Sequence, residues 1–190
     1  MKQIRSILLV MLAVLAIATC GVAQRKYALK SGIITFENSV AILGKPAAQR
    51  QVLYFDDYGM RERKELYEGD TLREAALCDG MHLYTLVFEE STAYKGGKST
   101  QGTEAPFRRD TTKGKSWTKL PAMKVAGRVC ETIRSVQGDD ETTLAGWNGI
   151  VLFAESSSGG IHTSSKAVKI SENAKISPEM FRVPASFRVR

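Results

Sequence analysis

The sequence is poor in cysteine and lacks the short motifs that mark common catalytic and metal sites. Its three cysteines among 190 residues are too few for a disulfide-framework miniprotein or for a zinc module made of paired Cys-x-x-Cys motifs. It contains no P-loop, no dinucleotide-binding glycine fingerprint, no His-Glu-x-x-His and no Gly-x-Ser-x-Gly. We therefore expect a protein that is not an enzyme and that uses no cofactor and no metal.

Histidine is equally scarce. Neither His82 nor His162 stands at a spacing from a nucleophile and an acid that supports a catalytic triad. His82 is predicted to be a structural residue on the same strand face as Tyr84. The acidic clusters at 56–57 and 139–141 lack the spacing of an EF-hand loop and are predicted to be solvated. Glycosidase-type carboxylate pairs assemble in space, and nothing in the sequence selects one.

Long apolar runs are also rare, and the longest lies at the start of the chain. Lys2 and Arg5 precede a run of 12 apolar residues at 7–18. Such a run fits a secretory signal peptide and is too short to span a bilayer. Residues 1–24 are therefore predicted to be a signal peptide, cleaved after Gln24 or after Ala23, with an uncleaved anchor as the alternative. Residues 25–190 would form one exported domain, periplasmic or envelope-associated.

Export changes the interpretation of the cysteines. Cys20 follows the apolar run and precedes Gly21, so acylation as a lipoprotein is an alternative to ordinary cleavage, although Thr19 is a poor match to the usual pattern. Thiols outside the cytosol tend to pair, which predicts a disulfide between Cys78 and Cys130. Two buried free thiols are the alternative, because sequence alone does not show how close the two Cα atoms lie.

The rest of the chain alternates with a period of two and has no long helical stripe. This predicts a mainly β domain with eight to ten strands, a curved antiparallel sheet or half-barrel, and little helix. The expected strands cover 27–43, 52–55, 60–67, 72–77, 81–88, 142–147, 150–155 and 161–170, with a closing edge segment at 181–189. The strand at 60–67 alternates charged and apolar residues, so we expect it to be solvated.

Turn signals separate these strands. Asp79-Gly80 and Asn148-Gly149 each lie between two β-prone runs and predict tight hairpins. Gly44-Lys45-Pro46 and Asp57-Tyr58-Gly59 predict further turns or bends. Ser177-Pro178-Glu179 has the pattern of an N-cap followed by proline at the first position of a short helical turn.

Positive charge is concentrated in one segment. The chain carries a formal charge of +7, yet outside residues 1–24 and 95–119 it has 18 basic and 18 acidic residues. Residues 95–120 are polar and lack a clear period, so we predict a mobile basic loop. This loop would contact an anionic membrane surface or an acidic envelope partner, and plain solubility is the alternative. Nucleic acid is not expected as a partner. The basic residues are Lys95, Lys98, Arg108, Arg109, Lys113, Lys115 and Lys119.

Four short motifs resemble those of exported β-domains from the bacterial envelope. They are Tyr54-Phe55-Asp56-Asp57-Tyr58-Gly59, Gly127-Arg128-Val129-Cys130, Trp147-Asn148-Gly149-Ile150-Val151-Leu152, and Asn173-Ala174-Lys175-Ile176 followed by Phe181 and Pro184. Val151 stands where proline is usual. Such domains resemble the LolA/LolB lipoprotein-carrier fold, a curved antiparallel sheet with helices across its concave face. The lid helices have no counterpart here, so the basic loop would have to replace them.

The resemblance implies a binding or carrier module for a lipid or another apolar ligand. Its candidate lining residues are Leu53, Phe55, Tyr84, Leu86, Phe88, Trp147 and Leu152. The alternative is that these side chains simply fill the core. The second functional hypothesis is an envelope interaction or accessory protein that uses the basic loop as its contact.

Overall fold

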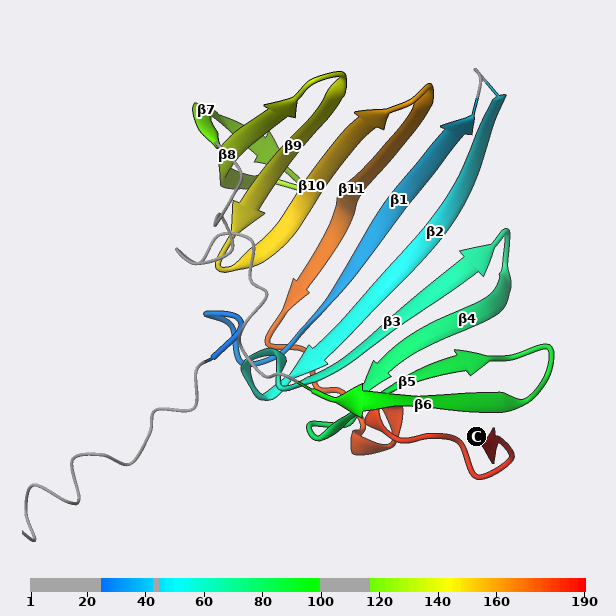
Figure 1. The fold of residues 1–190 in the computed structure, drawn as a ribbon. Helices are drawn as coiled ribbons and strands as arrows, with labels where there is room; N and C mark the ends of the chain where they lie inside the picture. The colour runs from blue at the N-terminus through cyan, green and yellow to red at the C-terminus, as the bar shows by residue number, and fades with distance from the viewer. Residues whose placement is uncertain (1–24, 43–44, 100–116) are drawn as a thin grey trace, which may run out of the picture.

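The computed structural model describes residues 25–42, 45–99 and 117–190. In these ranges it contains twelve β-strands and two 3₁₀ turns, η1 (Asp57–Gly59) and η2 (Pro178–Phe181) (Figure 1). None of the helical segments described is long and apolar enough to cross a membrane. The strands are β1 (Gly32–Ile42), β2 (Lys45–Asp56), β3 (Arg61–Glu68), β4 (Thr71–Cys78), β5 (His82–Val87), β6 (Thr92–Lys98), β7 (Thr118–Val125), β8 (Arg128–Gln137), β9 (Asp140–Trp147), β10 (Ile150–Ser158), β11 (Ile161–Glu172) and β12 (Arg188–Val189).

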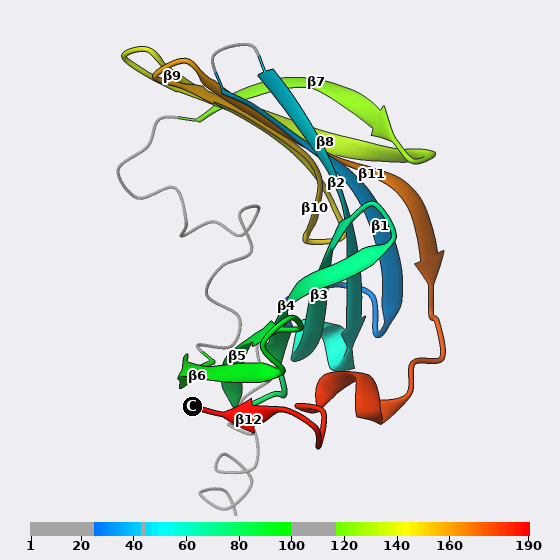
Figure 2. The same ribbon diagram turned by 90° about the vertical axis from the view of Figure 1, so that its right-hand side faces the viewer.

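All twelve strands form one open sheet. Their order is β12-β6-β5-β4-β3-β2-β1-β11-β10-β9-β8-β7, so β12 and β7 lie at opposite edges. Every neighbouring pair is antiparallel except β12 and β6, which run parallel. The sheet is strongly curved, and Figure 2 shows it from the side. The expected curved antiparallel half-barrel with little helix is therefore confirmed.

The hairpin turns follow from backbone conformations that few residues adopt. Asn148 and Gly149 have φ values of 53° and 81°, as a two-residue turn with both φ positive requires. At the predicted Asp79-Gly80 turn only Gly80 has a positive φ, and the Asp79 carboxylate instead accepts hydrogen bonds from the backbone N–H groups of Met81 and His82, both at 2.7 Å. A further tight turn at Ala126-Gly127 joins β7 to β8.

The sheet has twelve strands rather than the eight to ten predicted, because β6, β7 and β8 were not predicted as strands. Several boundaries were also wrong, and β2 begins at Lys45, within a predicted turn, rather than at residue 52. The first strand begins at Gly32 rather than at Tyr27, because residues 25–31 form the irregular N-terminal segment described below. The predicted loop at 95–120 is partly strand, since β6 continues to Lys98 and β7 starts at Thr118. The middle of that loop lies outside the described residues, as do residues 1–24, which hold the predicted signal peptide and Cys20.

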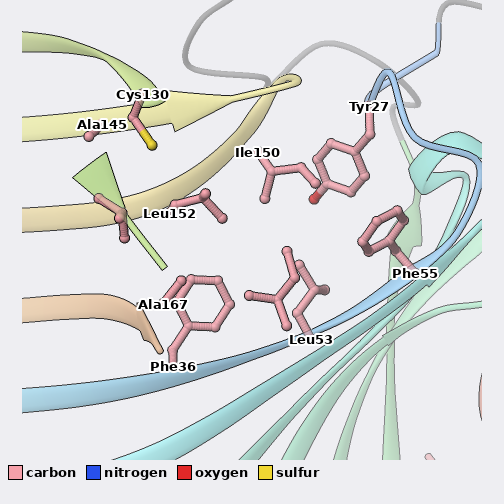
Figure 3. Packing of buried hydrophobic residues seen from close by; sticks show 11 residues of the cluster. Tyr27, Phe36, Leu53, Phe55, Cys130, Ala145, Ile150, Leu152 and Ala167 are labelled. Carbon is pink, nitrogen blue, oxygen red and sulfur yellow. The ribbon is translucent and has the colours of Figure 1, made fainter. Parts of the chain in front are cut away.

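The larger apolar core, here called the Phe55 cluster, gathers side chains from strands far apart in the sequence (Figure 3). It joins Tyr27 of the N-terminal segment to β1, β2 and β7–β11. The Tyr27 ring meets the Phe55 ring edge-on at 5.0 Å between centroids. The buried members are Tyr27, Ile34, Phe36, Leu53, Phe55, Val125, Cys130, Ala145, Ile150, Leu152 and Ala167.

A second core, the Phe181 cluster, lies where the C-terminal segment (173–190) packs against β4, β5 and β6. Figure 2 shows this segment passing below these strands, on the outside of the curve. As predicted, the Ser177 hydroxyl caps η2 by accepting a hydrogen bond from the Glu179 N–H. The closing edge segment predicted at 181–189 contains only the two-residue strand β12. Next to it, the Arg190 carbonyl oxygen accepts a hydrogen bond of 2.8 Å from the Lys95 N–H. The buried members are Ala75, Leu77, Leu86, Ala93 and Phe181.

Candidate functional site

The two clusters pack against opposite faces of the sheet, and β2 contributes a side chain to each side. Successive side chains of a strand point to opposite faces of the sheet, so Leu53 and Tyr54 lie on different faces. Leu53 pairs with Lys64, which in turn pairs with Ala76 on β4. Tyr54, by contrast, belongs to the face packed against the C-terminal segment. We call the face that carries Leu53, Lys64 and Ala76 the inner face, because the C-terminal segment covers the other one.

The inner face carries an apolar pocket of about 400 Å³, here called the Tyr94 pocket. Leu83 and Tyr94 are partly exposed there, with 44% and 39% of their surface accessible. The lining residues are Glu62, Lys64, Ala76, Leu77, Cys78, Leu83, Tyr84, Thr85, Tyr94, Lys95 and Gly96.

A second pocket of about 310 Å³, the Gln51 pocket, adjoins it and is more polar. Both volumes fall within the range of roughly 300–1,000 Å³ typical of small-molecule sites. Lys64 is the one residue that lines both pockets. The lining residues are Lys26, Tyr27, Phe36, Gln51, Leu53, Lys64, Gly149, Ile150, Val151 and Ser165.

The N-terminal segment (25–31) is fixed beside these pockets by a buried carboxylate. Lys26 Nζ lies 2.6 Å from Glu62 Oε2, and the Tyr27 hydroxyl donates a hydrogen bond to Glu62 Oε1. Glu62 is only 8% exposed, and both of its oxygens are therefore engaged. Burial, and secondarily the Glu62 charge, raise the pKa of Tyr27 well above its ordinary value. The hydroxyl thus stays protonated and remains a donor.

Lys64 differs from its neighbours in having no partner. Its side chain is exposed, and it forms no ion pair or hydrogen bond with any described residue. Glu74 lies diagonally across from it on the same face, since Glu74 pairs with Leu66, yet the two are too far apart for an ion pair. Within the part of the chain that the structure describes, no group compensates the Lys64 ammonium between the two pockets.

The opposite face of β3 buries a charged network, so the prediction of a solvated strand at 60–67 was wrong. Arg63 Nε donates to Glu65 Oε1 at 2.8 Å, and these side chains are 8% and 5% exposed. The Tyr67 hydroxyl donates to Glu65 Oε2 at 2.6 Å, and the Arg50 guanidinium stacks 3.9 Å from the Tyr67 ring centroid. Burial and this hydrogen bond raise the pKa of Tyr67 to about 12. The paired charges explain how the strand tolerates burial.

The seven predicted lining residues do not share one surface. Leu53 lines the Gln51 pocket, and Tyr84 borders the Tyr94 pocket although it packs against the Phe181 cluster. Phe55 and Leu152 are fully buried in the Phe55 cluster, and Trp147 packs against that cluster. Leu86 and Phe88 belong to the Phe181 cluster on the other face. Most residues that line these two pockets, among them Lys64, Gln51 and Tyr94, were not among the predicted ones.

The predicted basic contact is split in a similar way. Lys95 lines the Tyr94 pocket, and Lys98 is exposed at the end of β6. Lys119 Nζ lies 3.2 Å from Glu131 Oε1, so its charge is partly compensated. The other four basic residues, Arg108, Arg109, Lys113 and Lys115, lie outside the described residues.

The two cysteines predicted to pair are both free and buried. Cys78 is on β4 and Cys130 on β8, with six strands between them in the sheet order. A disulfide needs Cα atoms within about 7 Å. Cys130 lies in the Phe55 cluster, where burial raises the pKa of its thiol, while Cys78 lines the Tyr94 pocket. The structure therefore contains two buried free thiols and not the predicted disulfide.

Residues 25–42, 45–99 and 117–190 contain no group of three or more histidine, cysteine or acidic side chains that could hold a metal ion. His82 and Asp79 lie 3.9 Å apart, and His162 and Glu155 3.3 Å apart. Burial would raise the pKa of Asp79, but the N–H groups of His82 and Met81 outweigh it and lower that pKa. The His82–Asp79 contact thus belongs to a turn, and the His162–Glu155 contact lies on the exposed surface.

Solved structures share this fold at low sequence identity. An uncharacterised conserved protein from Thermus thermophilus matches with a TM-score of 0.59 and 9% identity, over 88% of this chain and 94% of that one. MucB in its complex with MucA from Pseudomonas aeruginosa matches with a TM-score of 0.52 and 16% identity, over 88% of this chain. The match spans 60% of the MucB chain.

A LolA superfamily protein from Nitrosomonas europaea, NE2245, also matches, with a TM-score of 0.41 and 11% identity over 84% of this chain and 93% of that one. This similarity is weaker than the similarity to MucB. No protein-family model and no curated protein matches the sequence. The likeness concerns the fold alone.

Proposed function

We propose that the protein is an exported, non-enzymatic binding module of the cell envelope that holds a small apolar or amphipathic ligand on its inner face. The observation that carries this proposal is the pair of adjoining pockets joined at Lys64, with partly exposed Leu83 and Tyr94 in one of them. Binding sites for small molecules are typically concave and lined mostly by apolar side chains with a few polar groups. The likeness in fold to MucB is consistent with a binding role.

The test combines native mass spectrometry with a pocket-filling variant. Protein purified from its own cell envelope should retain a small lipid, or should bind a fluorescent fatty-acid probe after delipidation. Thr85 is exposed, lines the Tyr94 pocket and pairs with Tyr94 across the strands, so Thr85→Trp should fill the pocket and abolish probe binding. Thr71→Trp is the matched control, because exposed Thr71 lies at the start of β4 and lines neither pocket.

Absence of any retained lipid, together with no change in probe fluorescence, would overturn this proposal. Loss of probe binding in both tryptophan variants would also count against it, since the effect would then not be specific to the pocket.

The second candidate is an envelope interaction protein, favoured by the match to MucB in complex with MucA. Its contact would be the basic segment predicted from the sequence, of which Lys95, Lys98 and Lys119 are described. Co-sedimentation with anionic and neutral vesicles at two salt concentrations tests the membrane form of this idea. Binding only to anionic vesicles, weakened by salt, would support it, and equal, negligible binding to both would exclude it.

A further inference from the structure

We infer that the inner-face ligand is a single-chain amphiphile whose anionic head group binds the Lys64 ammonium and whose tail lies in the Tyr94 pocket. This inference rests on the proposed function, since it names the ligand class of the same site.

The position of Lys64 is the first reason. Across β2, β3 and β4 the register places Leu53, Lys64 and Ala76 side by side on the inner face. Lys64 is thus a cation flanked by apolar neighbours, and it is the residue through which the Gln51 pocket and the Tyr94 pocket meet.

The local charge balance is the second reason. Glu62, the acid two residues before Lys64 on the same face, uses both carboxylate oxygens for Lys26 and Tyr27. No described acid forms an ion pair with Lys64. An anionic head group would complete a charge-assisted contact, which is among the stronger hydrogen bonds in proteins.

The asymmetry of the two pockets orients the ligand. On one side of Lys64, the Gln51 pocket offers polar groups from Lys26, Gln51 and Ser165. On the other side, the Tyr94 pocket is mostly apolar, with Ala76, Leu83 and Tyr94 in its lining. Its volume of about 400 Å³ lies near the lower end of the range for small-molecule sites, which suits one alkyl chain rather than several.

The test compares three amphiphiles that share a dodecyl tail and differ in the head group: dodecanoate, dodecyl maltoside and dodecyltrimethylammonium. Each is titrated below its micelle concentration by calorimetry against delipidated protein. We expect dodecanoate to bind more tightly than the neutral and cationic probes, and less tightly at high salt. Lys64→Gln should weaken dodecanoate binding about 5- to 10-fold, the loss expected for one ordinary hydrogen bond at this exposed position. It should leave dodecyl maltoside binding unchanged.

Two further variants sharpen the result. Lys169→Gln is the matched control, because Lys169 is exposed on β11 and lines neither pocket. Lys64→Glu should reverse the preference toward dodecyltrimethylammonium. Equal affinity for the three probes, or an equal loss of dodecyl maltoside in Lys64→Gln, would overturn the inference and leave the proposed function standing. No binding of any probe would overturn the proposed function itself.

Discussion

A Cβ atom on Gly149 would lie 2.8 Å from the carbonyl oxygen of Lys26, so the β9–β10 turn and the N-terminal segment meet through bare backbone. Ala28 N–H donates to the Asn148 carbonyl at 3.0 Å, and Tyr27 N–H donates to the Tyr58 carbonyl at 3.0 Å. The segment is therefore clamped between this turn and η1. Because it also lines the Gln51 pocket, the clamp and the candidate site are one structural unit.

Gly149→Ala tests this clamp. Gly149 has φ +81°, and Gly127 has φ +80° in the tight turn between β7 and β8, but nothing lies within 4 Å of a Cβ on Gly127. Both substitutions strain the backbone, at a cost of about 1–3 kcal/mol. Only Gly149→Ala adds a clash with another segment. We expect it to lower the free energy of unfolding in urea clearly more than Gly127→Ala does. Equal losses would show that the contact with Lys26 contributes nothing.

Tyr27→Phe removes the hydroxyl that donates to buried Glu62. The carboxylate would then lack one partner, and a buried acceptor left unsatisfied costs about 1–3 kcal/mol. Tyr94→Phe is the control, since Tyr94 donates to Glu90 at 2.8 Å in an exposed setting. We expect thermal unfolding of the Tyr27 variant to move to lower temperature and that of the Tyr94 variant to stay close to wild type. The opposite order would contradict the assignment of Glu62 as a buried anchor.

Local features of the chain are predictable from the sequence, because turns and strand periodicity depend on neighbouring residues. Asn148-Gly149 and Ser177-Pro178 specify their own backbone conformations, and both turns are predicted correctly. The tight turn at Ala126-Gly127 is missed because alanine at positive φ, here 45°, has no sequence signature. The N-terminal segment is wrongly predicted as strand because Tyr27 continues the apolar alternation, although it is held by the distant residues Glu62 and Asn148.

The candidate site is less predictable, because it depends on which face of each strand is covered. Tyr84, Leu86 and Phe88 alternate correctly, yet their face packs against C-terminal residues about 100 positions later, a contact that no local pattern encodes. In the sequence, Lys64 is one of many charges on a strand expected to be solvated. Its significance comes only from the register that places it between Leu53 and Ala76.

The rates at which the two free thiols are alkylated test whether the Tyr94 pocket is occupied. Cys78 is 8% exposed and lines the Tyr94 pocket, whereas Cys130 is 0% exposed and its pKa is raised by burial. Since the thiolate is the reactive form, an alkylating reagent should modify Cys78 faster than Cys130 in the native protein. Dodecanoate should slow modification of Cys78 alone. Peptide mapping by mass spectrometry measures both rates, and recovery of a Cys78–Cys130 disulfide would contradict the structure.

Tyr67 should make stability depend on pH in the alkaline range. Its pKa is about 12 in the folded protein against an ordinary value of 10.0. Between these values the unfolded chain releases this proton while the folded chain keeps it. The stabilisation is thus complete below about pH 10 and is lost as pH rises toward 12. Tyr67→Phe should flatten, without abolishing, the fall in urea midpoint over this range, because the pKa values of Tyr27 and Tyr54 are also raised. An unchanged slope would contradict the role of Tyr67.

The buried Arg63–Glu65 pair should be costly to break from either side. Removing one partner of a buried ion pair leaves an uncompensated charge and typically costs about 3–5 kcal/mol. Arg63→Met and Glu65→Met should each destabilise by an amount of this order, and the double variant by clearly less than the sum, because it leaves neither charge unpaired. The control pair is Arg73 and Glu68, 3.0 Å apart with side chains 45% and 56% exposed, where a surface contact contributes about 0–1 kcal/mol. Urea unfolding of the four variants in each cycle gives the coupling energies. Additive losses at Arg63 and Glu65 would mean that solvent or another group compensates these charges, and β3 would then be the solvated strand that its alternating charges suggest.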